Sequence, residues 1–137
     1  MENETIQIEI YNKREKTSEF VSVEKLDDKS FRVTENAVLN CRLTLGTEFE
    51  ARINQDSKFE IIRITQASDF LTRRFFLNRQ FTEQDYRVLG DEIMKQGGFW
   101  QIDFGSIATI NLPQNSTLDL DEVFRIFNFH PTEIVED

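Results

Sequence analysis

The fold of this chain is decided by one stretch, Phe99-Trp100-Gln101-Ile102-Asp103-Phe104-Gly105-Ser106-Ile107-Ala108-Thr109-Ile110-Asn111-Leu112. It predicts a β-hairpin, because aromatic and β-branched residues fill both arms and Gly105-Ser106 supplies the turn. Pro113 ends the second arm, since proline has no N–H to donate to a strand ladder. Nothing in the hairpin indicates chemistry. It therefore establishes architecture and leaves function to other features.

A helix is predicted on each side of the hairpin. Thr82 as N-cap with Asp85 three residues later begins the first, over residues 82–96, and Asp119 begins the second, over residues 119–128. Apolar residues recur at three- and four-residue spacing along both helices, so each buries one face. The residues expected to be buried where helices and hairpin pack as one unit are Tyr86, Leu89, Ile93, Ile107, Leu120, Val123, Phe124 and Phe127.

Two further features complete the second half of the chain. Gly90 lies on the apolar side of the first helix, where the lack of a side chain permits close approach to a sheet. Residues 70–78 read as a strand, and residues 132–135 add a last strand unless residues 132–137 are a frayed acidic tail. With that strand, residues 70–135 spell β-α-β-β-α-β, which is the ferredoxin-like order.

The first half is almost entirely β. Residues 5–11 alternate apolar and polar side chains, as a half-buried strand does. Residues 35–45 fit neither the strand nor the helix period and are expected to be irregular or a short strand, and Gly46 follows them with a tight turn. Strands are predicted at residues 5–11, 19–26, 31–34, 47–53 and 58–65, and they suggest a small curled sheet or partial barrel.

The fold class expected from these elements is α+β, with a β-rich lobe over residues 1–68 followed by a ferredoxin-like lobe over residues 69–137. A chain of 137 residues with 39% hydrophobic and 30% charged residues is long enough for one compact domain, or for two small lobes that share a core. Phe occurs thirteen times, against one Trp and two Tyr, and we expect most of these rings to be core. The two lobes are therefore expected to share one core.

Charge and cysteine content limit the partners and the compartment. The net charge of −9 repels nucleic-acid backbones and anionic membrane surfaces, so neither is an expected partner. The nearest basic cluster is Arg73-Arg74 with Arg63 and Arg79, which we interpret as a solvated outer face of a sheet. One cysteine, the absence of a secretory signal pattern at the N-terminus and no long apolar run place the chain in the cytoplasm.

Three parts of the sequence form a recognisable pattern: Leu45-Gly46-Thr47-Glu48-Phe49-Glu50-Ala51, residues 68–76, and residues 97–113 with the helix at residues 118–127. They resemble a small bacterial family known as domain of unknown function 4265. The resemblance covers about residues 20–130, and it implies a β-rich segment that leads into a strand-helix-hairpin-helix unit. The family tends to have an acid after the glycine, where this chain has Thr47. The resemblance implies no catalytic residues.

No catalytic, cofactor or metal site is expected. The only histidine, His130, and the only thiol, Cys41, are not brought together by any pattern, so a nucleophile with a base is not indicated. Asp119, Asp121 and Glu122 are close together but lie in the first turn of a helix, where acids are expected because of the helix dipole. Gly97-Gly98 follows a helix instead of opening one, which is the reverse of a phosphate-binding loop.

A protein-binding module is the expected function, with a partner protein or a second copy of the chain as ligand. One version is a bacterial immunity protein whose acidic surface meets a basic toxin, and the alternative class is a small-molecule sensor. The expected contact residues are Arg73, Arg74, Phe75 and Phe76. Strand alternation sends the apolar side chains of residues 70–77 to both faces, so either the N-terminal lobe or a partner must cover one of them.

Overall fold

The structure is a computed structural model that describes residues 4–77 and 82–135. The chain divides into two compact units, Met1–Asp69 and Phe70–Asp137, so the boundary lies one residue later than expected. Each unit has a hydrophobic cluster made only of its own residues. The expectation that the two lobes share one core stays a prediction.

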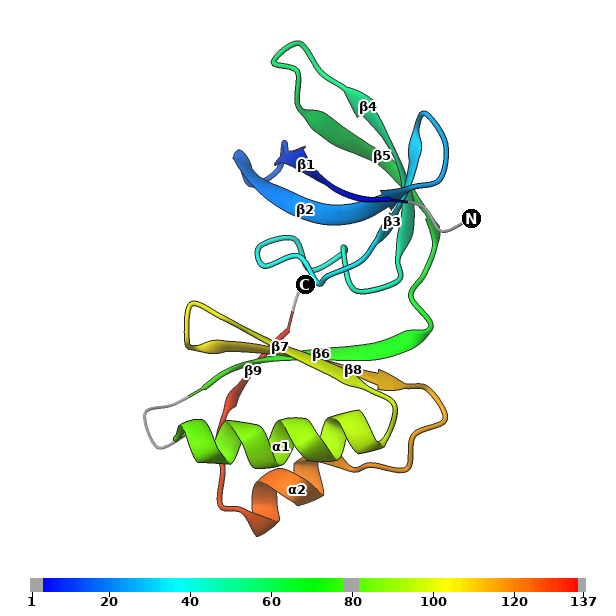
Figure 1. The fold of residues 1–137 in the computed structure, drawn as a ribbon. Helices are drawn as coiled ribbons and strands as arrows, with labels where there is room; N and C mark the ends of the chain where they lie inside the picture. The colour runs from blue at the N-terminus through cyan, green and yellow to red at the C-terminus, as the bar shows by residue number, and fades with distance from the viewer. Residues whose placement is uncertain (1–3, 78–81, 136–137) are drawn as a thin grey trace. The chain divides into compact units, whose positions relative to one another are not determined.

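The first unit is a closed five-stranded barrel in which the strands follow one another in chain order (Figure 1). Consecutive strands pair antiparallel. Five is an odd number, so the first and last strands run parallel, and they meet at one residue pair, Ile10 and Phe59. The barrel is closed where the sequence suggested a partial one. Its strands are β1 (Thr5–Asn12), β2 (Thr17–Lys25), β3 (Ser30–Val33), β4 (Glu48–Ile53) and β5 (Phe59–Gln66).

Alternation along the strands places the barrel core. Ile8 and Ile10 of β1 are buried, whereas Gln7 is exposed and Glu9, between the two isoleucines, is half-buried, as the period-two pattern predicts. The buried cluster of the barrel comprises Ile8, Ile10, Val21, Val23, Phe31, Val33, Ala37, Leu43, Phe49 and Ala51.

Residues 35–45 are irregular, as expected, and the half-buried Glu19 of β2 holds part of this segment. Its carboxylate accepts hydrogen bonds from the backbone N–H groups of residues 38–40 at 2.8–3.2 Å.

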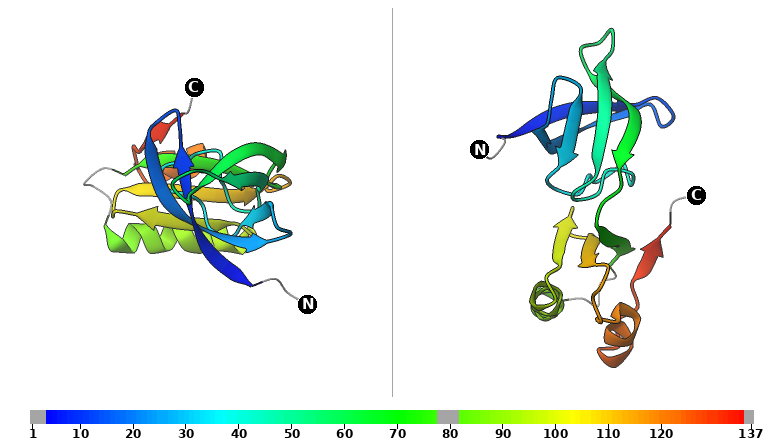
Figure 2. Two further views of the ribbon diagram at one scale, coloured as in Figure 1. Left: turned by 90° about the horizontal axis from the view of Figure 1, so that it is seen from above. Right: turned by 90° about the vertical axis from the view of Figure 1, so that its right-hand side faces the viewer.

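The second unit is a four-stranded antiparallel sheet with both helices on one face, as two views agree (Figures 1 and 2). The strand order is β7-β8-β6-β9. Residues 132–134 form a strand, so the expectation of a last strand is confirmed over the alternative of a frayed tail. The elements are β6 (Phe70–Phe76), α1 (Glu83–Lys95), β7 (Phe99–Asp103), β8 (Ile107–Pro113), α2 (Leu120–Ile126) and β9 (Thr132–Ile134).

The hairpin of β7 and β8 forms as predicted, but its turn differs. Asp103 pairs with Ile107, so the turn has three residues, Phe104 to Ser106, instead of two. Phe104 and Gly105 both have positive φ, at 54° and 69°. Glycine adopts this region without strain, and Phe104 adopts it because the turn requires two left-handed residues in succession.

The helix signals identify both N-termini correctly. The Thr82 hydroxyl accepts from the Asp85 N–H at 3.2 Å, and the Asp85 carboxylate accepts from the Thr82 N–H at 2.9 Å, which completes the capping box. At the start of α2 the Asp119 side chain accepts from the Glu122 N–H. Gly90 faces the ring of Trp100 so closely that a Cβ at this position would lie 2.3 Å from Nε1. The predicted close approach of helix and sheet is therefore confirmed.

The prediction that Phe127 is a core residue is wrong. Because α2 ends at Ile126, two residues early, Phe127 is the C-cap and its side chain is 47% exposed. Its ring stacks on that of Phe129, with the centroids 5.6 Å apart, instead of filling the core. The other predicted core residues are buried (Leu89, Ile93, Leu120 and Phe124) or half-buried (Tyr86, Ile107 and Val123).

Candidate functional site

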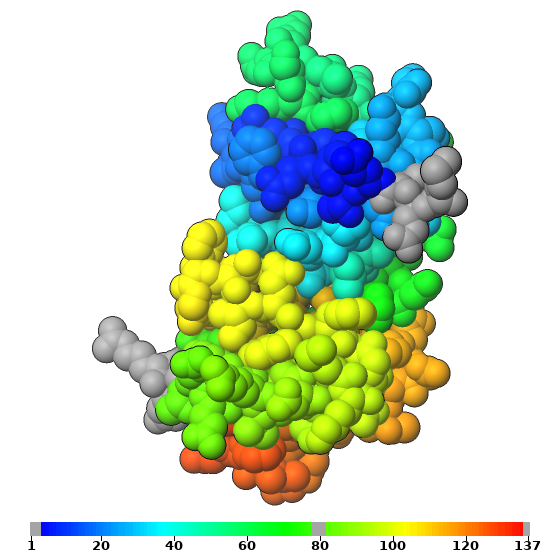
Figure 3. All heavy atoms as spheres, viewed as in Figure 1, coloured from blue at the N-terminus to red at the C-terminus, as the bar shows by residue number. Residues whose placement is uncertain are grey.

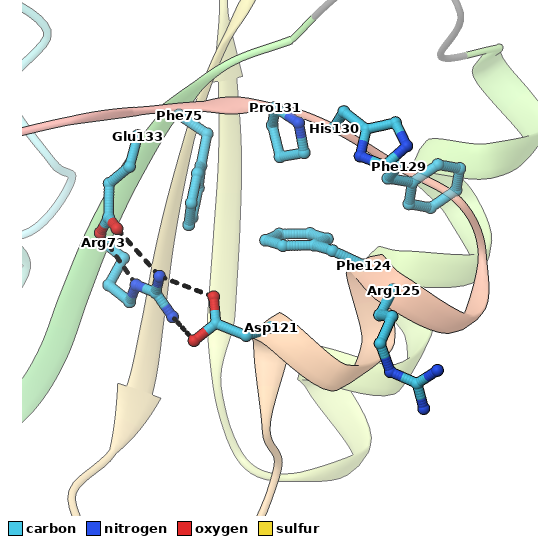
Figure 4. A pocket seen from close by; sticks show the side chains of 9 residues that line it. All are labelled: Arg73, Phe75, Asp121, Phe124, Arg125, Phe129, His130, Pro131 and Glu133. Carbon is cyan, nitrogen blue, oxygen red and sulfur yellow. Dashed lines mark hydrogen bonds and ion pairs between the residues drawn. The ribbon is translucent and has the colours of Figure 1, made fainter.

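A concave site in the second unit opens between β6, α2 and the segment that leads into β9. It has a volume of about 400 Å³ and mixes aromatic with charged side chains (Figure 4). We call it the Arg73 pocket. Its lining residues are Arg73, Phe75, Asp121, Phe124, Arg125, Phe129, His130, Pro131 and Glu133.

Arg73 joins two carboxylates that are far from it in sequence. Its Nε and Nη2 donate to the two oxygens of Glu133, each at 2.9 Å, so this contact is bidentate. Nη2 also donates to Asp121 Oδ1 at 3.0 Å, and Nη1 lies 3.4 Å from Oδ2. The guanidinium carbon lies 5.1 Å from the centroid of the Phe75 ring, which gives a cation–π contact. Figure 4 shows this ion cluster at one end of the pocket.

The ion cluster fixes the charge state of its members. Hydrogen bonds from Arg73 lower the pKa of Glu133 below its ordinary value. Hydrogen bonds to Glu133, followed by burial, which acts the other way, and by hydrogen bonds to Asp121, raise the pKa of Arg73. Glu133 therefore stays ionised and Arg73 stays protonated at neutral pH.

Aromatic rings form the rest of the pocket wall. Phe75 and Phe124 meet edge to face, with the ring centroids 5.1 Å apart and the planes at 80°. Phe129 continues this wall and stacks on Phe127 just outside the pocket. Ile126, next to Phe127 at the end of α2, is 63% exposed. Large apolar side chains are thus exposed at the end of α2, and one of them, Phe127, contacts the pocket wall through Phe129.

His130 and Arg125 lie at the rim. The Nε2 atom of His130 is 2.9 Å from Asn128 Oδ1, and Arg125 pairs with Glu122 on the same helix. Hydrogen bonds to Glu122 raise the pKa of Arg125. Cys41 belongs to the irregular segment of the first unit. Within residues 4–77 and 82–135, no group of three or more His, Cys, Asp or Glu side chains could hold a metal ion.

The four expected contact residues separate by strand alternation. Arg73 and Phe75 face α2, whereas Arg74 and Phe76 lie on the other side of the sheet. Arg74 is 5% exposed, so its interpretation as part of a solvated face is wrong, while Phe76 is 50% exposed. Phe75 is covered by Phe124 of its own unit.

Two further basic residues were grouped with Arg73 and Arg74 in the sequence. Arg63 is on β5 of the first unit and pairs with Glu50 at 2.7 Å, and Arg79 lies outside the described residues. Sequence reasoning missed Glu133 as a partner of Arg73, and it assigned Asp121 to helix capping alone. The one available signal was that both are acids on elements of the same expected ferredoxin-like unit as the strand at residues 70–78. Among the described residues, no helix is long and apolar enough to cross a membrane.

Comparison with known proteins gives the fold and no function. No family model matches the chain, and no curated protein matches it. Among solved structures, it is similar to a hypothetical protein from Neisseria gonorrhoeae, with a TM-score of 0.67 and 16% sequence identity over 98% of this chain and 94% of that one. At this identity the likeness shows a shared fold, mostly β and of the α+β class with two sheets.

Proposed function

We propose that the chain is a protein-binding module without enzymatic activity, and that the second unit makes contact through the Arg73 pocket and the exposed end of α2. The main observation is that the ring of Phe129 in the pocket stacks on Phe127, which is 47% exposed outside it, and that Ile126 beside Phe127 is 63% exposed. Large exposed apolar side chains next to a concave aromatic wall are typical of the centre of a protein interface. Charged side chains surround this surface, as they do at an interface rim.

The charge of the site indicates the chemistry of the partner. Asp121 keeps most of its carboxylate exposed, with 74% of the side chain accessible, although it accepts from Arg73. A carboxylate has about four acceptor positions, so oxygens of Asp121 and Glu133 can receive further donors. Together with the net charge of −9, this favours a partner that inserts an apolar side chain and presents Lys or Arg at the rim. A basic toxin would be one such partner.

Three further proposals accompany the function. We propose that residues 70–135 form a ferredoxin-like unit, supported by the strand order β7-β8-β6-β9, the antiparallel pairing and the position of both helices on one face. We propose that the chain acts in the cytoplasm, since it has a single cysteine. The resemblance to the bacterial family known as domain of unknown function 4265 remains a proposal of membership.

The test is capture of a partner by the tagged full chain from its native host, together with sedimentation of the purified chain. We expect one stoichiometric protein partner, or a dimer of the chain itself. Ile126→Glu combined with Phe127→Glu should abolish the interaction, because two charges would enter the apolar centre of the contact. Met94→Glu is the matched control, since Met94 is equally exposed but lies on α1.

Two results would contradict this function. Capture that is equal for wild-type and the double α2 variant would place the contact elsewhere. A monomer without a protein partner, whose melting temperature rises with a small molecule, would favour the sensor function instead.

A further inference from the structure

A second concave site lies in the first unit, at the end of the barrel where β1 begins. It has a volume of about 380 Å³, within the range of small-molecule sites. We call it the barrel pocket. Figure 3 shows the start of β1 (dark blue) between the β4–β5 hairpin (green) and the β2–β3 turn (light blue). The lining residues are Ile6, Ile8, Lys25, Asp28, Lys29, Phe31, Ala51, Arg52, Ile53 and Phe59.

The barrel pocket follows from how the barrel closes. β1 pairs with β5 only at Ile10 and Phe59, so the first half of β1 has β2 as its partner on one side and no described strand on the other. β4 and β5 continue past this point as a hairpin that turns at Asn54, whose side chain accepts from the Lys58 N–H at 3.1 Å. The opening between these segments exposes part of the barrel interior.

The inside of the barrel pocket is apolar and well ordered by packing. Its floor is formed by Ile8, Phe31 and Ala51, all buried. Phe59 meets Phe31 edge to face at 5.3 Å between centroids, which fixes one wall. Ile53 forms the outer wall and is 64% exposed. An apolar ligand would therefore remove a large apolar side chain from water without disturbing the core.

The rim of the barrel pocket is cationic in an acidic protein. It carries Lys25, Lys29 and Arg52 against one acid, Asp28, a balance of +2 in a chain of net charge −9. Lys25 lies 3.7 Å from Asp28. Within the part of the chain that the structure describes, neither Lys29 nor Arg52 forms an ion pair. Two cations beside an apolar hollow thus have no anion of their own.

We propose that the barrel pocket binds a free medium-chain monocarboxylate, with the alkyl chain against Phe31, Ile53 and Phe59 and the carboxylate at Lys29 and Arg52. The apolar lining requires an apolar body, and the unpaired rim cations require an anionic end. A water-sized group occupies about 30 Å³ in a liquid, so the volume admits an alkyl chain of about ten carbons. This ligand site is separate from the protein contact proposed for the second unit.

The test is calorimetric titration of the full chain with decanoate, well below its micelle concentration. We expect saturable binding of one decanoate per chain. Acetate, which has the carboxylate alone, and decyltrimethylammonium, which has the chain with the opposite charge, should each bind at least about tenfold more weakly, because each lacks one of the two interactions.

Three variants locate the site. Lys29→Glu with Arg52→Glu should weaken decanoate binding about tenfold or more, since two attractive contacts become repulsive. Arg14→Glu with Lys16→Glu changes the net charge equally in the exposed β1–β2 turn and should leave the affinity unchanged. Ile53→Gln removes apolar wall at an exposed position that the fold tolerates, and it should weaken binding several-fold.

The proposal is overturned if decanoate does not saturate, if decyltrimethylammonium binds equally well, or if the Lys29 and Arg52 variant keeps the wild-type affinity. Binding to phosphatidylglycerol vesicles without saturable binding of decanoate would also overturn it, because the rim cations would then recognise a lipid surface.

Discussion

The contact between Gly90 and Trp100 allows a sharp test of how α1 packs on the sheet. A Cβ at position 90 would lie 2.3 Å from Nε1, 2.4 Å from Cε2 and 2.7 Å from Cζ2 of the indole. Contacts under 3.0 Å do not occur for real Cβ atoms, so Gly90→Ala must displace the ring or the helix. The ring cannot move freely, because Trp100 is half-buried and packs beside Tyr86, with the centroids 6.2 Å apart.

Two effects of opposite sign set the magnitude. Alanine in a helix interior is favoured over glycine by about 0.8–1.0 kcal/mol, whereas overpacking of a well-filled contact costs about 1–3 kcal/mol. The distances are far inside contact range, so the overpacking cost should be near its upper end. We expect Gly90→Ala to lower the free energy of unfolding by about 1–2 kcal/mol. An open helix position would show the opposite sign.

A double-mutant cycle separates the clash from other effects. Trp100→Phe removes the indole atoms that the new Cβ would meet, so in that background Gly90→Ala should be neutral or stabilising. The coupling free energy between the two sites should be about 2 kcal/mol, large for a pair of residues. Urea unfolding followed by far-UV circular dichroism is the assay, because it reports the helices without using Trp100 as a probe. If Gly90→Ala stabilises the wild-type chain by about 1 kcal/mol, the indole does not occupy this space and the reasoning is refuted.

Two other predictions use the same unfolding assay. Phe124→Ala should cost about 3–5 kcal/mol because the ring is buried, whereas Phe127→Ala should cost under about 1 kcal/mol because the ring is half exposed; equal costs would contradict the packing described for α2. Glu133→Gln tests the Arg73 ion cluster. The pKa of Glu133 is lower in the folded chain than its ordinary 4.5, so its stabilising contribution is present above about pH 4.5 and is lost as the pH falls through the folded value. At neutral pH the wild-type chain and Glu133→Gln should differ in free energy of unfolding by under about 1 kcal/mol, because the ion pair is partly exposed. This difference should shrink between pH 7 and pH 3, and a difference that grows would contradict the ion pair.

The sequence predicted most reliably what local interactions decide. Thr82 and Asp85 satisfy each other's backbone groups three residues apart, so the start of α1 could be found without any knowledge of the fold. The start of α2 at Asp119 has the same cause. Strand alternation in the first half is equally local, because adjacent side chains must point to opposite faces. These rules find the elements and their buried faces.

What the sequence could not provide are contacts between distant segments. Arg73 meets Asp121 and Glu133, which are 48 and 60 positions away. Asp121 had a local interpretation as a helix-start residue, which sequence reasoning preferred. Glu133 was expected on a last strand or, alternatively, in an acidic tail, and neither interpretation named a partner for it. The anchoring of residues 38–40 by Glu19 was missed for the same reason. A hydrogen bond between residues about twenty positions apart produces no periodic pattern in the sequence.

Both candidate sites occur where helix cover or strand pairing ends early, and their charges lead to different ligands. In the second unit α2 has seven residues and β9 has three, so the sheet is left open around Arg73. Because Arg73 already has two carboxylates of its own chain, an added anion would have to displace them, and cationic groups are favoured there. In the first unit β1 pairs with β5 at a single position, so the first half of β1 is unpaired on that side. Among the described residues, Lys29 and Arg52 at this opening have no carboxylate as an ion-pair partner. An anion that has an apolar chain should therefore select the barrel, and a basic protein should select the second unit. If decanoate binding and partner capture were abolished by the same α2 variant, the two sites could not be independent.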